Sequence, residues 1–392
     1  MGIIGFLTLF VLLQVLGMGG MTVEPGEVFR LGVQADGNRL EQSVLMDALA
    51  RYRVILVGET HDDPEHHAVQ KHVIAAMADR GGELAVAMEM FPRSMQPILD
   101  QWSAGTLNED EFLDQTSWYF TWGFDAELYL PILRLAKERH IPLLAMNIDR
   151  TIVSQVRMRG LESLEGSTRK NLPPLAQPLP EYRRRLQEVF HSHPMMAAAG
   201  NLDYFIDAQR VWDGVMAQAI ADWSHRHPQG RVVGLAGSGH LLMKHGIPHQ
   251  LAAMGLQNDT VVLLPWDGQD NPISYQASDF VWGTPHPVPT KPLSRMGVAL
   301  EAASVSSQGE GGAGRGGAIV ITEVTPGSPG ERAGLQVGDQ PIRLDQQPLP
   351  KPHTLVRLLR SPSRNPKPVL TFIRNHQEHR VTIDLDGQSI KG

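Results

Sequence analysis

With 392 residues, the chain is longer than a single hydrophobic core usually becomes, so we expect two domains. It contains no cysteine, which excludes disulfides, thiolate metal sites, thiol catalysis and a lipid-modified N-terminal cysteine. The formal net charge of −7 accompanies basic residues that are scattered along the chain, and this distribution argues against nucleic-acid binding.

Residues 1–20 are interpreted as a signal peptide or an N-terminal anchor. Residues 3–16 are apolar and several small residues follow them. An apolar run of about 14 residues is short for a membrane-spanning helix and typical of a signal-peptide core. No charged residue precedes this run, so the segment could also stay in place as an anchor. We therefore expect export to the bacterial periplasm, or membrane association through an uncleaved N-terminus.

The first strong pattern after the N-terminal segment is a polar turn that follows a buried strand. Residues 54–57 are uninterruptedly apolar, as in a parallel strand that is buried on both faces, and Gly58 ends the run. Glu59 and His61 follow on the turn. In open α/β sheets, ligands bind at this carboxyl edge of the strands.

A helix should begin directly after this turn. Asp63 and Pro64 are a favourable N-cap and first-turn pair, and the helix is expected to run to about Asp79. Three histidines of this helix are expected on its solvent-exposed face: His66, His67 and His72.

The same strand-then-polar pattern recurs along the chain. Apolar runs at 84–88, 141–146 and 231–236 each end in polar residues, and 261–264 is a further expected strand. Because the carboxyl ends of parallel strands meet at one edge of a sheet, one polar site assembled from distant segments is expected. Its expected members are Glu59, His61, Glu89, Asn147, Asp149, Arg150 and His240.

Two carboxylates and two imidazoles are the chemical centre of this set. Glu59, His61, Glu89 and His240 could ligate a divalent metal, or could act without metal as general acid and base. Asn147 and Arg150 could orient an anionic group. A hydrogen-bonded network that only fixes the loops is the third interpretation of the same residues.

The connection between the third and fourth strands is much longer than a crossover requires. It spans residues 151–229 and contains a strongly amphipathic helix at 203–224. We interpret this helical insertion as a cover over the site.

A proline-rich linker at 283–292 separates the α/β domain, residues 27–282, from a second domain at 293–387. Small residues at 328–329, Ala333-Gly334-Leu335 and Gly338-Asp339 resemble a PDZ domain of the bacterial type. The resemblance implies recognition of peptide C-termini by β-strand addition. The residues implied in carboxylate binding are Arg295, Met296, Gly297 and Val298.

The first domain also resembles a known family. The motifs that carry the resemblance are Gly58-Glu59-Thr60-His61, Glu89-Met90-Phe91, Ala145-Met146-Asn147, Ala208-Gln209 with Trp212-Asp213, and Gly237-Ser238-Gly239-His240. Together they are similar to the haem-binding uptake ChaN-like family, in the Tiki and erythromycin esterase superfamily. The resemblance implies haem binding, iron uptake and a homodimer that holds haem between subunits through tyrosine and histidine. The chain departs from the family in lacking a lipid-anchoring cysteine and in adding the PDZ domain.

A haem needs an axial nitrogen or oxygen ligand and a broad apolar slot. The insertion offers Tyr204, His191 and His193 as candidate ligands, with Tyr204 preferred, and Met195 and Met196 nearby.

The expected fold is therefore α/β, with a mainly parallel sheet covered by helices, a helical insertion and a small, mostly β PDZ-like domain. The preferred function is an exported haem- or iron-binding protein with a peptide-recognition module. The alternative is a metal-dependent hydrolase or protease that uses Glu59, His61, Glu89 and His240, with the PDZ domain presenting substrate. Whether the protein is an enzyme stays open at this stage.

Overall fold

A computed structural model describes residues 20–31, 38–192, 200–267, 272–286, 296–302, 319–350, 352–360 and 365–385. The chain forms two compact units. The first is made of Met1–Phe112 and Glu127–Pro287, and the second of Leu113–Ala126 and Val288–Gly392. Within the described ranges, no helix is both long enough and apolar enough to cross a membrane. Residues 1–19, the candidate haem ligand His193, the PDZ residue Arg295 and positions 287–292 of the expected linker lie outside the described residues.

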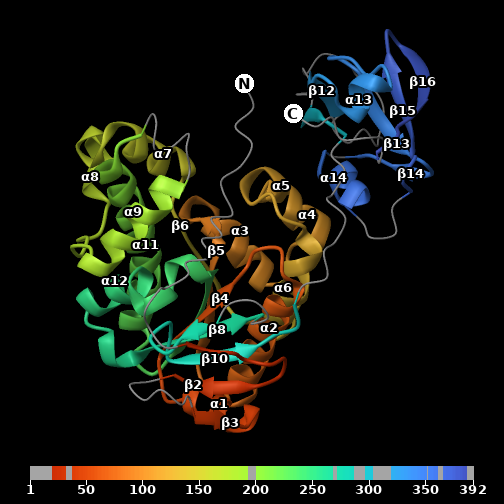
Figure 1. The fold of residues 1–392 in the computed structure, drawn as a ribbon. Coiled ribbons are helices and arrows are strands. Elements are labelled where there is room, and N and C mark those ends of the chain that lie inside the picture. The colour runs from red at the N-terminus through yellow and green to blue at the C-terminus, as the bar shows by residue number, and fades with distance from the viewer. Residues whose placement is uncertain are drawn as a thin grey trace. The chain divides into compact units, whose positions relative to one another are not determined.

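An eight-stranded sheet forms the centre of the first unit (Figure 1). Its strand order is β3-β2-β10-β8-β4-β7-β5-β6, and the six strands from β10 to β6 are parallel to one another. The two strands at one edge, β2 and β3, are antiparallel. The strands are β2 (Val28–Arg30), β3 (Asn38–Leu40), β4 (Val54–Glu59), β5 (Leu84–Pro92), β6 (Leu143–Asn147), β7 (Arg231–Gly237), β8 (Thr260–Trp266) and β10 (Phe280–Gly283). A separate short pair joins β1 (Gly20–Met21) to β9 (Ile273–Ser274).

Helices cover both faces of this sheet, which confirms the expected α/β class (Figure 1). The helices of the first unit are α1 (Gln42–Leu49), α2 (Pro64–Asp79), α3 (Gln96–Ser103), α6 (Ala126–Glu138), α7 (Arg150–Arg159), α8 (Gly166–Lys170), α9 (Pro180–Ser192), α11 (Leu202–Arg226) and α12 (Ile247–Ala253). Between α3 and α6, α4 (Glu109–Gln115) begins in the first unit and ends in the second, and α5 (Trp118–Thr121) belongs to the second. The expected start of α2 is confirmed, because the Asp63 carboxylate accepts hydrogen bonds from the N–H groups of Glu65 and His66.

The two-residue period of the strands decides which face each side chain joins. Val54 and Leu56 of β4, with Ala85 and Ala87 of β5, pack in one core with the α11 residues Met216, Ala217 and Ile220. The intervening residues of β4 face the side on which α2 lies (Figure 1). By the same period, Glu59 belongs to the α2 face and Glu89 to the α11 face.

The edge strand β6 is closed by a side chain. The Gln96 side chain donates a hydrogen bond to the Leu143 carbonyl and accepts one from the Ala145 N–H, both at 2.8 Å. An amide that pairs in this way takes the place of a ninth strand, so this edge is not open for pairing with another chain.

Two of the three histidines expected on the outside of α2 are buried. His66 and His67 are 4% and 3% exposed, and only His72 is exposed. The expectation failed because both buried rings have polar partners. His66 Nδ1 accepts a hydrogen bond from the Thr60 N–H at 2.8 Å, and His67 lies 3.0 Å from Gln70 Oε1.

The second unit carries a small β-rich domain. Its strands are β11 (Val298–Ala302), β12 (Ile319–Val324), β13 (Gln340–Leu344), β14 (Gln347–Pro348), β15 (Val369–Arg374) and β16 (Gln377–Thr382), with helices α13 (Pro329–Arg332) and α14 (Pro352–Arg360). β11 and β12 pair with each other, and the other four form a sheet of order β14-β13-β15-β16.

The last strand of this domain begins earlier than its apolar residues indicate. A strand at 381–385 is expected from the sequence, but β16 spans Gln377–Thr382. Asn375 and His376 both have positive φ, 51° and 63°, and form a two-residue hairpin turn that starts pairing at once.

Candidate functional site at the carboxyl edge of the sheet

Glu59, the last residue of β4, is the centre of the first half of the site. Its side chain is fully buried, and both oxygens accept hydrogen bonds. Oε1 accepts from the Tyr129 hydroxyl at 2.8 Å and lies 2.7 Å from His61 Nδ1, while Oε2 accepts from the Gln70 amide at 2.7 Å. Gln70 comes from α2 and Tyr129 from α6, so the carboxylate is fixed from the face that its strand position predicts.

The charges of this half follow from its contacts. Burial alone would raise the pKa of Glu59, but the charges of His67 and His61 and the hydrogen bonds from His61 and Gln70 outweigh burial and lower the pKa to about 2. Burial alone would lower the pKa of His61, whereas the hydrogen bond to Glu59 and the nearby carboxylate charges raise it above 6.5. Glu59 is therefore ionised, and its contact with His61 favours the protonated form of that ring, which is 18% exposed.

His240 is the centre of the second half, on the α11 face. Its Nδ1 lies 2.6 Å from Oδ1 of Asp213, and Asp213 is fully buried in α11. The other Asp213 oxygen accepts a hydrogen bond from the hydroxyl of Tyr182, a residue of α9, at 2.6 Å. Burial alone would lower the pKa of His240, but the charge of Glu89 and the hydrogen bond and charge of Asp213 raise it above 6.5.

Glu89 lies between the two histidines. Its Oε1 is 3.7 Å from His240 Nε2, and its Oε2 accepts a hydrogen bond from the Gly237 N–H at 2.7 Å. A Cβ at Gly237 would lie 3.2 Å from His61 Nε2 and 3.7 Å from Glu89 Oε2. In each histidine, Nδ1 thus lies within hydrogen-bonding distance of a carboxylate, that of Glu59 for His61 and that of Asp213 for His240. Glu89 lies near both rings. We call Glu59, His61, Glu89, Asp213 and His240 the rim site.

The other expected members of this edge have different roles. The Asn147 amide donates to the Glu89 carbonyl at 2.6 Å and accepts from the Trp212 indole at 2.7 Å, so it joins β6 to α11 beside the site. Arg150 is half-buried, and burial lowers its pKa against the opposing charge of Glu89. Asp149 caps α7 through the Thr151 N–H and is exposed, so it serves the helix.

The metal interpretation finds no geometric support in the described part of the chain, where no three His, Asp or Glu side chains are grouped so that they could hold a metal ion. The physical reason is that the oxygen and nitrogen atoms that could ligate a metal are already engaged with other residues of the site. Both oxygens of Glu59 and one nitrogen of each histidine are engaged within the site, and Glu59 and Glu89 belong to opposite faces of the sheet.

Four residues, Asp213 of the rim site and three that hydrogen-bond to the site, were not singled out from the sequence as site residues. Gln70, Tyr129, Tyr182 and Asp213 all lie on helices, where side-chain position depends on how the helix packs. Only Asp213 had a sequence signal, since it belongs to the Trp212-Asp213 motif. The other three have no neighbouring pattern that marks them.

The candidate haem ligands lie in the insertion, away from these contacts. Tyr204, in the first turn of α11, is half-buried, and a Cβ at Gly160 would lie 2.8 Å from its ring. His191, near the end of α9, is exposed beside Phe190. Phe190 and Phe205 pack with ring centroids 5.7 Å apart, so the two candidate ligands sit on adjoining helix ends.

The expected carboxylate-binding loop of the second unit is described from Met296 onward. Gly297 has a φ of 73°, and a Cβ there would lie 2.1 Å from the Cβ of Ser328. β11 follows this loop and pairs only with β12 among the described strands, so its other edge is available there for an added strand.

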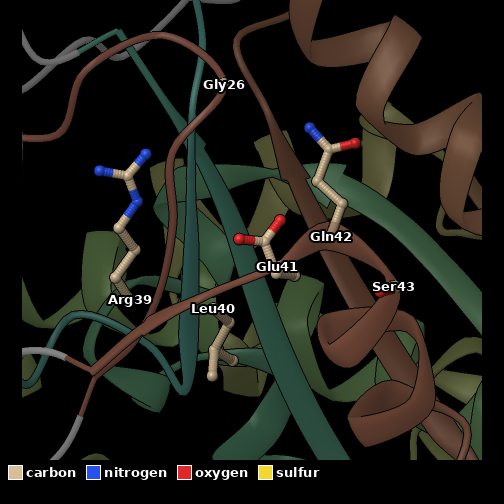
Figure 2. A pocket seen from close by; sticks show the side chains of 6 residues that line it. All are labelled: Gly26, Arg39, Leu40, Glu41, Gln42 and Ser43. Atoms are coloured by element: carbon tan, nitrogen blue, oxygen red, sulfur yellow. The ribbon is translucent and has the colours of Figure 1, made fainter.

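Two surface hollows lie outside all of these sites. One of about 240 Å³ adjoins the start of α1, where the side chains of Arg39, Glu41 and Gln42 extend to one side and Leu40 to the other (Figure 2). The second, of about 350 Å³, lies where β5 and β6 begin and is lined by Glu83, His140, Trp223 and His227 among others. Neither hollow contains an expected site residue.

Comparisons with known proteins agree with this architecture. A family model described as haem-binding uptake, Tiki superfamily, ChaN matches residues 45–251, which is just over half of the chain. A PDZ domain model matches residues 320–374. The solved structure of cofacial heme binding to ChaN of Campylobacter jejuni has a TM-score of 0.53 and 21% identity, and the match covers 66% of this chain and 98% of that chain. At this identity the likeness shows the fold alone.

Two further matches are shorter. The PDZ domain of EpsC from Vibrio cholerae is 21% identical over 24% of this chain and 99% of that chain, with a TM-score of 0.19. A Ralstonia nicotianae protein named "Putative zinc metalloprotease RSc1411" is 49% identical over 51 residues. That match spans 13% of this chain and only 11% of the length of the Ralstonia protein.

Proposed function

The chain belongs to the haem-binding uptake ChaN family of the Tiki superfamily and carries a PDZ domain, and from this membership we propose that it binds haem on its helical insertion. The observation that supports the location is the state of Tyr204. Its ring is half-buried against Gly160, and no hydrogen bond to its hydroxyl occurs among the described residues. A phenol oxygen that accepts no hydrogen bond from the described residues is available to haem iron, and tyrosine is a known haem ligand.

The surroundings of Tyr204 supply apolar surface as well. Met158 in α7, two residues before Gly160, is 70% exposed, whereas Phe190, Phe205 and Ile206 are buried and support the adjoining ends of α9 and α11 from within. A flat apolar macrocycle needs surface of this kind beside its axial ligand. His191 is the candidate for a second ligand, because it lies at the adjoining helix end with an exposed ring.

The test is a spectral comparison of ligand variants with haemin. In Tyr204→Phe, the ring stays on Gly160 but the oxygen is gone, so the visible spectrum of bound haemin should change and the affinity should fall. The matched control is Tyr52→Phe, at a half-buried tyrosine outside the insertion, which should leave the spectrum unchanged. A Tyr204→Phe spectrum identical to that of the wild type would remove Tyr204 as the ligand.

We also propose the finer roles that family and sequence support: export, iron uptake and haem-dependent dimerisation. β1 begins at Gly20, the last residue of the expected signal peptide or anchor, and its pairing with β9 supports a boundary for cleavage or membrane anchoring just before Gly20. N-terminal sequencing of the periplasmic and membrane fractions tests export. Sedimentation with and without haemin tests the dimer, and growth of a deletion strain on haemin as iron source tests uptake.

For the second unit, we propose recognition of peptide C-termini along β11. The support is the available edge of β11 and the Gly297 turn before it. Selection from a peptide library with free C-termini, repeated on the selected peptides after C-terminal amidation, tests this proposal. Amidated peptides should bind much more weakly, because the loop N–H groups lose the carboxylate.

The family match favours haem binding over hydrolysis, yet one observation keeps acid–base catalysis as a second candidate. The rings of His61 and His240 are partly exposed, both have raised pKa values, and both lie near Glu89. Such groups could move protons to and from a bound water or leaving group. Turnover of a panel of esters and peptides that is lost in Glu89→Gln, with haemin affinity unchanged, would support this candidate.

A further inference from the structure

Two side chains of helix α9, in the insertion, contact the rim site, although neither is one of its five residues. The Tyr182 hydroxyl donates a hydrogen bond to Asp213 at 2.6 Å, and Tyr182 is 3% exposed. One turn further on, Arg185 donates to the carbonyls of Leu242 and Gly239 at 3.0 and 3.2 Å. Its guanidinium lies 5.1 Å from the centre of the Tyr182 ring, so the two side chains approach the site side by side.

Tyr182 determines how Asp213 presents its carboxylate. A carboxylate held by one partner can rotate about its Cβ–Cγ bond, whereas donors on both oxygens fix its plane. In Asp213 the second donor is Tyr182, which binds Oδ2. The other oxygen, Oδ1, lies 2.6 Å from His240 Nδ1. The tyrosine thus fixes the acceptor for His240 without touching the imidazole.

Arg185 holds the loop that carries His240. Gly239 directly precedes this histidine and Leu242 follows it by two residues, so the guanidinium holds the loop on both sides of the ring. Immediately afterwards, Met243 and Lys244 have φ values of 59° and 58°, a conformation that is costly for residues other than glycine. A strained loop of this kind keeps its shape only when its surroundings restrain it.

We propose that Tyr182 and Arg185 are positioning residues of the rim site, which hold His240 with Nδ1 on Asp213 and Nε2 toward Glu89. This inference deepens the second candidate function, because it treats the rim site as a working site. It also gives the insertion a second role: the segment that carries the candidate haem ligands assembles the rim site.

The experiment follows the Nδ1 proton of His240 by NMR in the full-length protein. An imidazole N–H that is buried on a carboxylate exchanges slowly with water and gives a resolved downfield signal. His240→Gln assigns the signal by removing it. In Tyr182→Phe and in Arg185→Gln, exchange of this proton should accelerate by about tenfold or more, as expected when a hydrogen bond that holds its acceptor is lost.

The matched control is Arg183→Gln on the same helix. Arg183 makes an exposed ion pair with Asp203 at 2.6 Å and therefore ties α9 to α11 without reaching the rim site. Its variant should keep the wild-type exchange rate, and Arg185→Lys, which retains a donor, should recover part of the protection.

Two results would overturn the proposal: unchanged exchange in both Tyr182→Phe and Arg185→Gln, or equal acceleration in Arg183→Gln. Circular dichroism and melting curves identify a variant that fails to fold. If Tyr182→Phe or Arg185→Gln does so, the exchange rate in the other variant tests the proposal. Haemin titration and turnover on the same samples report on the proposed functions separately, because the NMR signal requires neither haem nor substrate.

Discussion

Gly237 lies against the ring of His61, so closely that a Cβ at Gly237 would lie 2.9 Å from His61 Cε1. The backbone of β7 therefore sets the position of a side chain that follows β4. β4, which ends two residues before His61, and β7, which ends at Gly237, are neighbours in the sheet, and Glu59 pairs with Gly237 in the register.

This contact predicts that Gly237→Ala displaces His61. The methyl group should force the imidazole away from its place near Glu89 and destabilise the fold by about 1–3 kcal/mol, the usual cost of overpacking a filled site. Urea unfolding measures the loss. Gly239→Ala is the control, since nothing lies within 4 Å of its added Cβ, and it should unfold like the wild type. Equal loss in the two variants would contradict the predicted contact.

Glu59 should contribute stability that depends on acid pH. Its folded pKa of about 2 lies below the ordinary value of 4.5, so its contribution is fully present above about pH 4.5 and is lost as pH falls toward 2. Glu59→Gln should remove this part of the loss of unfolding free energy at acid pH. The difference in unfolding free energy between wild type and variant, followed from pH 6 to 2, should therefore shrink with falling pH; a constant difference would contradict the ion pair.

Asp213→Asn should lower the pKa of His240, since the charge and hydrogen bond that raise it would be gone. The sign for stability is opposite to that of Glu59. The raised pKa of His240 contributes stability below about pH 6.5, the ordinary histidine value, and this contribution is lost as pH rises through the folded pKa. NMR titration of His240 in both proteins measures the shift directly. A pKa that stays the same in the variant would exclude Asp213 as its cause.

In the PDZ domain, Arg374 should be required to keep Asp339 stable in the core. Asp339 is 1% exposed, and Arg374 binds both of its oxygens, Nε to Oδ1 at 2.6 Å and Nη2 to Oδ2 at 2.7 Å. Arg374→Ala leaves this carboxylate with the hydrogen bond from the Gln336 N–H and should lower the free energy of unfolding by about 1–3 kcal/mol. Hydrogen exchange of β13 and β15 in the full chain reports the loss. Arg380→Ala, at an exposed arginine of β16, should change the hydrogen exchange of these strands little.

The sheet and its polar edge could be predicted because they follow from short-range pattern. Uninterrupted apolar runs marked β4, β5, β6, β7 and β8, and the polar residues after them included Glu59, Glu89 and His240. The edge strands β2 and β3 and their neighbour β10 have only three or four residues each, too few for a periodic signal.

The residues that fix the rim site could not be predicted in the same way. Asp213 and Tyr182 are brought to His240 by two helices of the insertion, and the sequence does not specify how those helices pack. His67 is buried for a related reason, since its ring lies 4.2 Å from that of Tyr129 in α6, about 60 residues away in the chain.

Haemin titration of the purified full-length protein, followed by absorbance, tests the central claim most directly. Haem binding on the insertion predicts a Soret band that shifts and saturates at a fixed ratio of haem to chain, and that is retained in a Glu59→Gln/His61→Gln double variant. A spectrum that rises without saturation, as for haemin that partitions onto any apolar surface, would contradict the account.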